Sequence, residues 1–206
     1  MESMVVIDFE TTGMSPLQNC RATEIAAVVV QDGRITGRYQ SLMNSGAWVP
    51  PFIENLTGIS NQMLRSAPSS AQVMAEVADF VGDMPLVAHN ASFDEKFWDS
   101  ELALISRTRR QSFACSMLLA RRLLPHAPNH KLGTLNRWAG LPDTGKAHRA
   151  LADAEMAANL TIYMGKLLRE HYGVPEVSHT LLRTLQKVPT GKILYTLDSL
   201  SRQATH

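Results

Sequence analysis

The sequence predicts an α/β domain, and three features of the chain carry this prediction. An apolar segment at the N-terminus reads as a buried strand. Two further strand-like segments follow it, joined by an Asp-Gly turn. Later in the chain, short apolar segments alternate with longer segments whose apolar residues recur at helical spacing.

The first strand covers Val5 to Glu10 and ends in two acids, Asp8 and Glu10. Side chains alternate between the faces of a strand, so Asp8 and Glu10 point the same way. Two neighbouring carboxylates at the end of a buried strand repel each other and lose hydration. This arrangement suits a cation held between them, but an isolated Asp-x-Glu is more often a strand whose last acids reach solvent. Gly13 then allows a tight turn.

The next two strands are predicted over residues 24–30 and 35–43, as an antiparallel meander with the turn at 31–34. Residues 44–58 read as a loop, and Ser60 is expected to cap a short helix that ends near Pro68. A helix over 69–81 is predicted to open with a capping box of Ser69 and Gln72.

A buried strand over 85–90 is expected to lead into a helix. Ser92 and Glu95 form a second expected capping box, which places Asp94 in the first helical turn, where the helix dipole favours a carboxylate. The remaining predictions are a short strand near Phe113, helices over 116–124, 132–139 and 149–171, a main domain over 1–172, and a C-terminal appendage of unknown role over 173–206.

The chain has 206 residues, 45% of them hydrophobic, which is enough for one domain with a sizeable core. The longest clean apolar run, Ile25–Val30, is too short to span a bilayer, and the N-terminus lacks the features of a secretory signal. Cys20 and Cys115 suggest neither a disulfide framework nor a zinc site. We therefore expect a cytoplasmic protein that does not associate with membranes.

Positive charge is concentrated in one part of the chain. The whole protein carries a net charge of +1, but residues 107–149 hold nine Lys or Arg and the single acid Asp143, which makes this segment +8. Such a segment suits a polyanionic partner, with Arg109 and Arg110 as expected phosphate contacts. The alternative is that these residues form solvated helix faces.

Five residues could form one catalytic site: Asp8, Glu10, Asp94, Asp153 and His148. An all-oxygen ligand set favours Mg²⁺ or Mn²⁺, and four carboxylates can hold two such ions about 3.5–4 Å apart. A neutral imidazole nearby can take a proton from water. His148 and Asp153 fit this arrangement if His148 lies on the loop and Asp153 lies inside the following helix. Alternatively, Asp94 is only a helix-start acid and His148 a surface residue.

Three segments of the chain together resemble a known family. They are Asp8-Phe9-Glu10-Thr11-Thr12-Gly13, Val87-Ala88-His89-Asn90-Ala91-Ser92-Phe93-Asp94 and His148-Arg149-Ala150-Leu151-Ala152-Asp153-Ala154, with Leu56-Thr57-Gly58-Ile59 between the first two. In this order they resemble the DEDDh class of 3′–5′ exonucleases in the DnaQ-like family. That group includes the proofreading epsilon subunit of bacterial replicative polymerase and ribonuclease T. Each motif is weak alone, and their joint order is what carries the resemblance.

The resemblance implies a ribonuclease-H-like fold with a five-stranded mixed sheet flanked by helices. It implies two Mg²⁺ or Mn²⁺ ions, bridged by Asp8 and completed by Glu10, Asp94 and Asp153, with His148 as general base. It also implies that Thr11 and Thr12 hold the terminal nucleotide, that Ile59 wedges against the terminal base, and that Asn90 and Phe93 line the strand's path. From residue chemistry alone, Ile59 is as readily a core residue.

The implied function is hydrolysis at the 3′ end of DNA, preferably single-stranded, with release of nucleoside 5′-monophosphates. The implied partners are nucleic-acid 3′ ends, with a DNA polymerase or another replication protein as a further candidate. Two alternatives stay open: an exonuclease directed at RNA, because the sequence contains no motif that reports 2′-hydroxyl contacts, and a non-catalytic module that docks on a polymerase.

Overall fold

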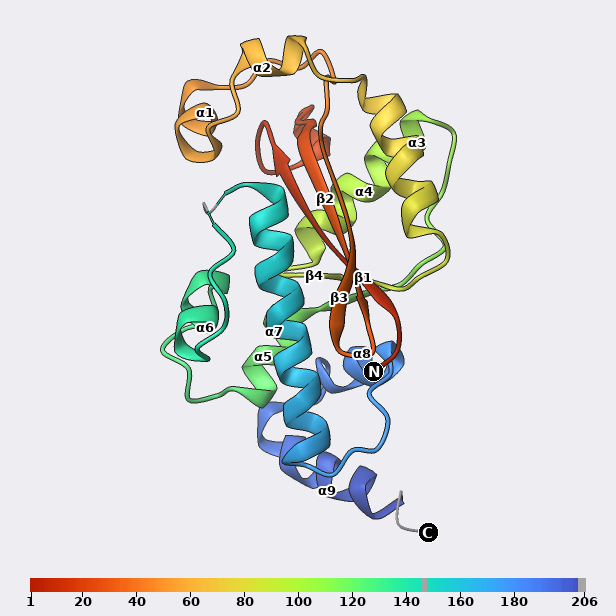
Figure 1. The fold of residues 1–206 in the computed structure, drawn as a ribbon, viewed down its shortest axis with the longest axis vertical. Coiled ribbons are helices and arrows are strands. Elements are labelled where there is room, and N and C mark those ends of the chain that lie inside the picture. The colour runs from red at the N-terminus through yellow and green to blue at the C-terminus, as the bar shows by residue number, and fades with distance from the viewer. Residues whose placement is uncertain (146–147, 204–206) are drawn as a thin grey trace.

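A computed structural model of the protein describes residues 1–145 and 148–203. Its centre is a five-stranded sheet in the order β3-β2-β1-β4-β5 (Figure 1). The strands are β1 (Met4–Thr11), β2 (Ala22–Gln31), β3 (Arg34–Leu42), β4 (Leu86–Ala88) and β5 (Phe113–Cys115). β1, β2 and β3 pair antiparallel, whereas β4 runs parallel to β1 and β5 parallel to β4, so the sheet is mixed. The expected α/β architecture is confirmed.

Helices cover both faces of this sheet (Figure 1). They are α1 (Pro51–Thr57), α2 (Asn61–Arg65), α3 (Ser70–Val81), α4 (Ser92–Leu104), α5 (Ser116–Leu123), α6 (Leu132–Trp138), α7 (Ala150–Glu170), α8 (His179–Leu185) and α9 (Ile193–Gln203), with 3₁₀ turns at Pro16–Gln18 and Thr190–Lys192. Alternate residues of β1 feed the two cores, because Met4 and Val6 pack under α7 while Val5 and Ile7 pack under α3 and α4. β1 is therefore buried on both sides, as a central strand should be.

Two local predictions were wrong. Residues 44–58 are not all loop, since Pro51 begins α1 and Gly58 ends it with a left-handed φ of 76°. Proline at the first helical position and glycine just past the last are helix boundary signals as well as loop signals. Ser92 and Glu95 do not cap α4: the helix begins at Ser92 itself, and the preceding Ala91 already has helical backbone angles without a side-chain cap.

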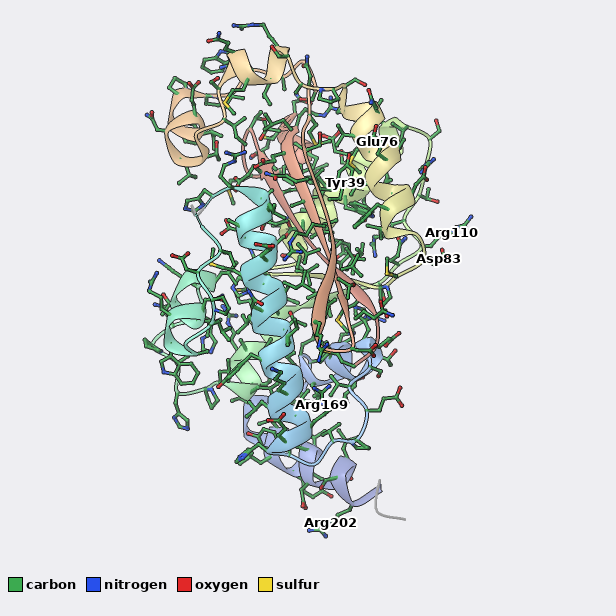
Figure 2. The ribbon with its side chains drawn as sticks, viewed as in Figure 1. Tyr39, Glu76, Asp83, Arg110, Arg169 and Arg202 are labelled. Atoms are coloured by element: carbon green, nitrogen blue, oxygen red, sulfur yellow. The ribbon has the colours of Figure 1, made fainter. Side chains whose placement is uncertain are left out.

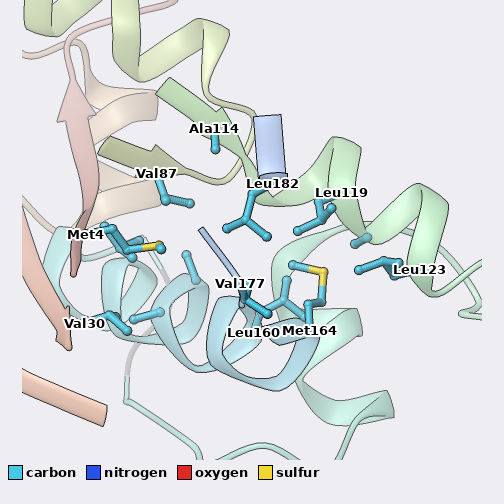
Figure 3. Packing of buried hydrophobic residues seen from close by; sticks show 14 of the residues in the cluster. Met4, Val30, Val87, Ala114, Leu119, Leu123, Leu160, Met164, Val177 and Leu182 are labelled. Carbon is cyan, nitrogen blue, oxygen red and sulfur yellow. The ribbon is translucent and has the colours of Figure 1, made fainter. Parts of the chain in front are cut away.

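The segment after residue 172 contributes to the core. Val177 and Leu182 lie beside Leu160 and Met164 of α7 in one hydrophobic cluster (Figure 3). His179 is also buried, and its Nε2 bonds the carbonyl of Leu86 in β4 at 2.8 Å. The division into a domain over 1–172 and an appendage stays a prediction, but a truncation there would strip these contacts from the sheet.

Substitution of Leu182 by alanine should therefore lower the free energy of unfolding by about 2–5 kcal/mol, the usual cost of truncating a buried leucine. Leu182 is 1% exposed, whereas Leu194 in α9 is 66% exposed and supplies the matched control. Leu194→Ala should change stability by less than about 0.5 kcal/mol. Urea denaturation measures both, and equal effects of the two substitutions would show that α8 is not part of the cooperative core.

Candidate active site

The acids of β1 lie where the strand ends beside α4 and α7. The pairing of β1 with β2 slips by one residue between Glu10 and Thr11, so a bulge follows directly after the second acid. Bulges re-aim side chains at the ends of strands. Asp8 and Glu10 both line a cavity of about 230 Å³, which Asp94, His148 and Asp153 also line. The structure thus brings all five proposed catalytic residues to one cavity.

Asp94 fixes α4 against the central strand. One oxygen of its carboxylate accepts a hydrogen bond from the backbone N–H of Phe9 at 3.1 Å, between the two acids of β1. Asp94 is 2% exposed and belongs to the first turn of α4, as expected. The chain enters this helix through Asn90, which has a left-handed φ of 68°.

His148 lies outside α7, and Asp153 lies in the first turn of that helix. The backbone N–H of His148 donates to the Asp153 carboxylate at 3.0 Å, and His148 has a left-handed φ of 60°. Glu10, His148 and Asp153 each offer one potential ligand atom, and these three atoms lie within 4.8 Å of one another. His148 could therefore act either as a base or as a ligand in this conformation.

Burial disfavours the ionised form of all four carboxylates, and repulsion from neighbouring acids adds to this for Asp8 and Glu10. Burial, and then the charges of Asp94, Asp153 and Glu10, raise the pKa of Asp8 well above its usual range. Burial, followed by Asp153 and Glu24, raises the pKa of Glu10 to about 8. Burial also raises the pKa of Asp94 to about 8, although the N–H of Phe9 opposes it, and raises the pKa of Asp153. Cations bound in this cavity would offset the free-energy cost of ionising these buried carboxylates.

Glu24 and Arg149 form a clamp that the sequence analysis missed. Glu24 stands opposite Glu10 in the β1–β2 pairing and is fully buried. It accepts hydrogen bonds from Arg149 at 2.8 and 3.1 Å and from the N–H of Ala150 at 3.0 Å, and so caps α7 from the neighbouring strand. Burial favours the neutral acid, but these bonds and one from Gln40 outweigh it and lower the pKa of Glu24. A single acid inside the apolar run of β2 was the available signal.

Arg149→Ala should destabilise the protein at the lower end of roughly 3–5 kcal/mol, because it leaves the Glu24 charge buried while its own side chain is 33% exposed. Adding Glu24→Gln should recover part of the loss, since the amide carries no charge. Chemical denaturation of the two single variants and the double variant measures the coupling, for which we expect about 1–3 kcal/mol. Strictly additive effects would mean that the clamp contributes no coupling.

The predicted substrate contacts divide into two groups. Thr11, Asn90 and Phe93 line the cavity, as expected. Thr12 is turned away from it, because its hydroxyl accepts a bond from the N–H of Arg21 at 3.0 Å. Ile59 is not at the cavity either.

The side chain of Ile59 is fully buried in a small cluster with Val49, Ile53 and Leu64. The expected wedge position of Ile59 is therefore not met in this structure, because packing between α1 and α2 occupies the side chain. Ile53 and Leu56, both in α1, are the neighbouring apolar residues that reach the cavity.

Several cations of the basic segment are already neutralised. Arg109 pairs with Glu95 and with Asp99, each at 2.7 Å, and Arg107 pairs with Asp79 at 2.6 Å. Arg110 lies near Asp83 on the α3 side of the molecule (Figure 2), along a different hollow from the acids. Neither Arg109 nor Arg110 lines the cavity that holds the acids, and their role as phosphate contacts stays a prediction. Lys146 lies outside the described residues.

Comparison with known proteins decides the family. A family model described as Exonuclease matches residues 5–161. The chain belongs to this exonuclease family. A DNA polymerase III subunit epsilon from Aquifex aeolicus is 32% identical over 186 residues, covering 90% of each chain. The 3′-5′ exonuclease DinG of Bacillus subtilis is 33% identical over 209 residues, which are 100% of this chain and 22% of DinG.

The fold comparison agrees with the exonuclease family. Exonuclease X, solved in complex with duplex DNA carrying a 5′ overhang, superimposes with a TM-score of 0.70 at 25% identity, covering 89% of this chain and 99% of that one. The resemblance to DEDDh-class 3′–5′ exonucleases and the ribonuclease-H-like fold are thereby confirmed, as is the enzyme class.

Proposed function

We propose that this exonuclease hydrolyses DNA from the 3′ end, preferably single strands, and releases nucleoside 5′-monophosphates with the help of two Mg²⁺ or Mn²⁺ ions. The supporting observation is the convergence of Asp8, Glu10, Asp94 and Asp153 on one cavity with an exposed histidine at its edge. Buried carboxylates with raised pKa values are a costly arrangement that a divalent cation would stabilise.

The donor set fits such ions, since carboxylate oxygens are the ligands preferred by Mg²⁺ and Mn²⁺. Asp8, Glu10, Asp94 and Asp153 would hold them. When bound, the ions supply electrostatic stabilisation of the charge that develops on the phosphodiester. The N–H of Phe9 orients Asp94, and the N–H of His148 orients Asp153. An imidazole nitrogen of His148 accepts the proton of the attacking water, and Thr11 and Phe93 border the space for the last nucleoside.

Substrate polarity and metal dependence are tested together with 5′-labelled oligonucleotides. Single-stranded DNA, duplex DNA and RNA are incubated in parallel with Mg²⁺, with Mn²⁺ or with chelator. We expect a ladder of progressively shorter labelled DNA with either ion, and none with chelator. Immediate release of the label as a mononucleotide would instead show cleavage from the 5′ end, and faster digestion of RNA would favour the RNA alternative.

The cellular setting is also a proposal. The Aquifex relative is named as a polymerase subunit, which supports a DNA polymerase or another replication protein as partner. The two cysteines, Cys20 and Cys115, are not paired with each other, which suits a reducing cytoplasm. Among the described residues, no helix combines the length and apolar character needed to cross a membrane. Co-purification with the replicative polymerase tests the partner.

A further inference from the structure

A second hollow adjoins the catalytic cavity and carries positive charge. It has a volume of about 570 Å³, and we call it the basic groove; it is lined by Arg121, His130 and Lys131 together with Asn90, Asn129 and Met117. His89 and Asn90 line both this groove and the catalytic cavity, so the two hollows meet at these residues. A chain lying in the cavity can continue directly into the groove.

The cations of the basic groove are available to a ligand. Within the described part of the chain, Arg121 and Lys131 pair with no carboxylate, and the Arg121 guanidinium donates to the sulfur of Met117 at 3.8 Å. Both residues are exposed. Arg107, Arg109 and Arg149 of the same basic segment, in contrast, are held by acids. Arg121 and Lys131 therefore present positive charge beside the cavity.

The groove is held in shape by hydrogen bonds. The His89 ring bonds Ser116 Oγ at 2.9 Å and the carbonyl of His130 at 3.0 Å, which ties β4 to the start of α5 and to the loop before α6. The His130 ring bonds the carbonyl of Leu124 at 3.3 Å, and the N–H of Lys131 donates to Asn129 Oδ1 at 2.9 Å. The loop that carries Lys131 is thus fixed relative to the acids.

The lining of the catalytic cavity includes apolar residues as well as the acids. Ile53, Leu56 and Met14 supply apolar surface, which suits the base of a terminal nucleoside. A strand whose last base contacts these apolar residues can leave the cavity across His89 and Asn90, into the basic groove.

We propose that the basic groove binds the phosphates of the nucleotides that lie 5′ of the scissile bond, so that the enzyme binds a polynucleotide strand more tightly than an isolated nucleotide ester. This inference rests on the proposed 3′ exonuclease function. Contacts of this kind are electrostatic and sequence-independent, and they weaken as salt competes for the phosphates.

The test compares a substrate that reaches only the cavity with substrates that also reach the groove. The p-nitrophenyl ester of thymidine 5′-monophosphate is the first, and 5′-labelled oligo(dT) and oligo(rU) of about 20 nucleotides are the others. The Arg121→Ala, Lys131→Ala double variant should raise KM for the oligonucleotides about tenfold or more at low salt and leave hydrolysis of the ester unchanged. For two lost phosphate contacts to a single strand, the slope of log KM against log salt should fall by roughly 1.4.

The matched control is the Arg34→Ala, Lys166→Ala double variant, which removes two exposed cations from a hollow at the other end of β2. This control should have the same kinetics as the wild type on all three substrates. The thermal midpoint should be unchanged in both double variants. Oligonucleotide kinetics identical to wild type in the groove variant, or an equal loss on the ester, would overturn the inference. If the wild type cleaves none of the substrates with either metal, the proposed function fails instead. Comparing oligo(dT) with oligo(rU) shows whether the enzyme prefers a DNA strand or an RNA strand.

Discussion

Asp8→Asn should abolish exonuclease activity and, at the same time, stabilise the metal-free protein at alkaline pH. Loss of activity should reach at least about 10³-fold, equivalent to roughly 4 kcal/mol in the barrier, because the substitution removes the ligand at the centre of the proposed cage. The asparagine keeps the volume of the side chain but removes the charge that Asp94, Asp153 and Glu10 oppose. Degradation of labelled single-stranded DNA and thermal denaturation in chelator measure the two effects.

The sign of the stability effect follows from proton binding. The folded-state pKa of Asp8 is raised, and that of Glu10 is raised to about 8, so the folded protein holds protons that the unfolded chain has already released. Stability of the metal-free protein should therefore decline as pH rises from about 4 towards 8, and added Mg²⁺ or Mn²⁺ should restore it. A change of 1 kcal/mol corresponds to about 2–4 °C in thermal midpoint at this size.

Asp83→Asn is the control for Asp8→Asn, since Asp83 is an exposed acid on the α3 side, away from the cavity (Figure 2). It should leave the activity and the pH dependence unchanged. Wild-type activity in Asp8→Asn would refute the proposed metal cage. A pH dependence as steep as that of the wild type would show that repulsion among these carboxylates does not limit stability.

His148→Asn should lower turnover by roughly 10²–10⁴-fold, the usual contribution of a positioned general base. Asparagine is chosen because it tolerates the left-handed backbone of residue 148 better than alanine does and cannot take up a proton. If His148 acts only as a base, the concentration of Mn²⁺ at half-maximal activity should stay the same. The acidic limb of the profile of kcat against pH should flatten.

The neighbourhood of His148 also allows a different result. Because its ring shares a 4.8 Å cluster with Glu10 and Asp153, a shifted Mn²⁺ requirement with a preserved pH profile would make His148 a ligand instead. His126→Asn replaces an exposed histidine of the same basic segment and should leave both parameters unchanged. Binding of labelled single-stranded DNA in Ca²⁺ separates a loss of turnover from a loss of strand binding.

Local patterns predicted most of the elements, since strands and helices follow from residues close together in the chain. The Asp-Gly turn between β2 and β3 has positive φ at both Asp32 and Gly33, as that dipeptide indicated. The order of the motifs led to Asp8, Asp94 and Asp153, which the fold does bring together. The positions of Asp8 and Glu10 were predictable because both residues lie on one strand.

Long-range pairing could not be predicted in the same way. Glu24 and Arg149 are 125 residues apart, and no periodicity connects them. The basic segment was visible as a sum of charges, but which arginines are neutralised depends on where Glu95, Asp99 and Asp79 lie in space. Ile59 was misplaced for a related reason: an apolar residue near a motif gives no indication of whether it faces a ligand or a small core.

The chain begins at the end of β1 that lies away from the acids. The N–H of Glu2 bonds the carbonyl of Val177 at 3.1 Å, and α8 and α9 lie at this same end of the molecule (Figure 1). The eight residues of β1 rise about 3.3 Å each, which puts roughly 23 Å between Met4 and Thr11. A biotin group attached to residue 1 would anchor the protein to a glass surface by the end of β1 opposite the acids. Digestion of individual labelled strands could then be followed by microscopy without the tether obstructing them.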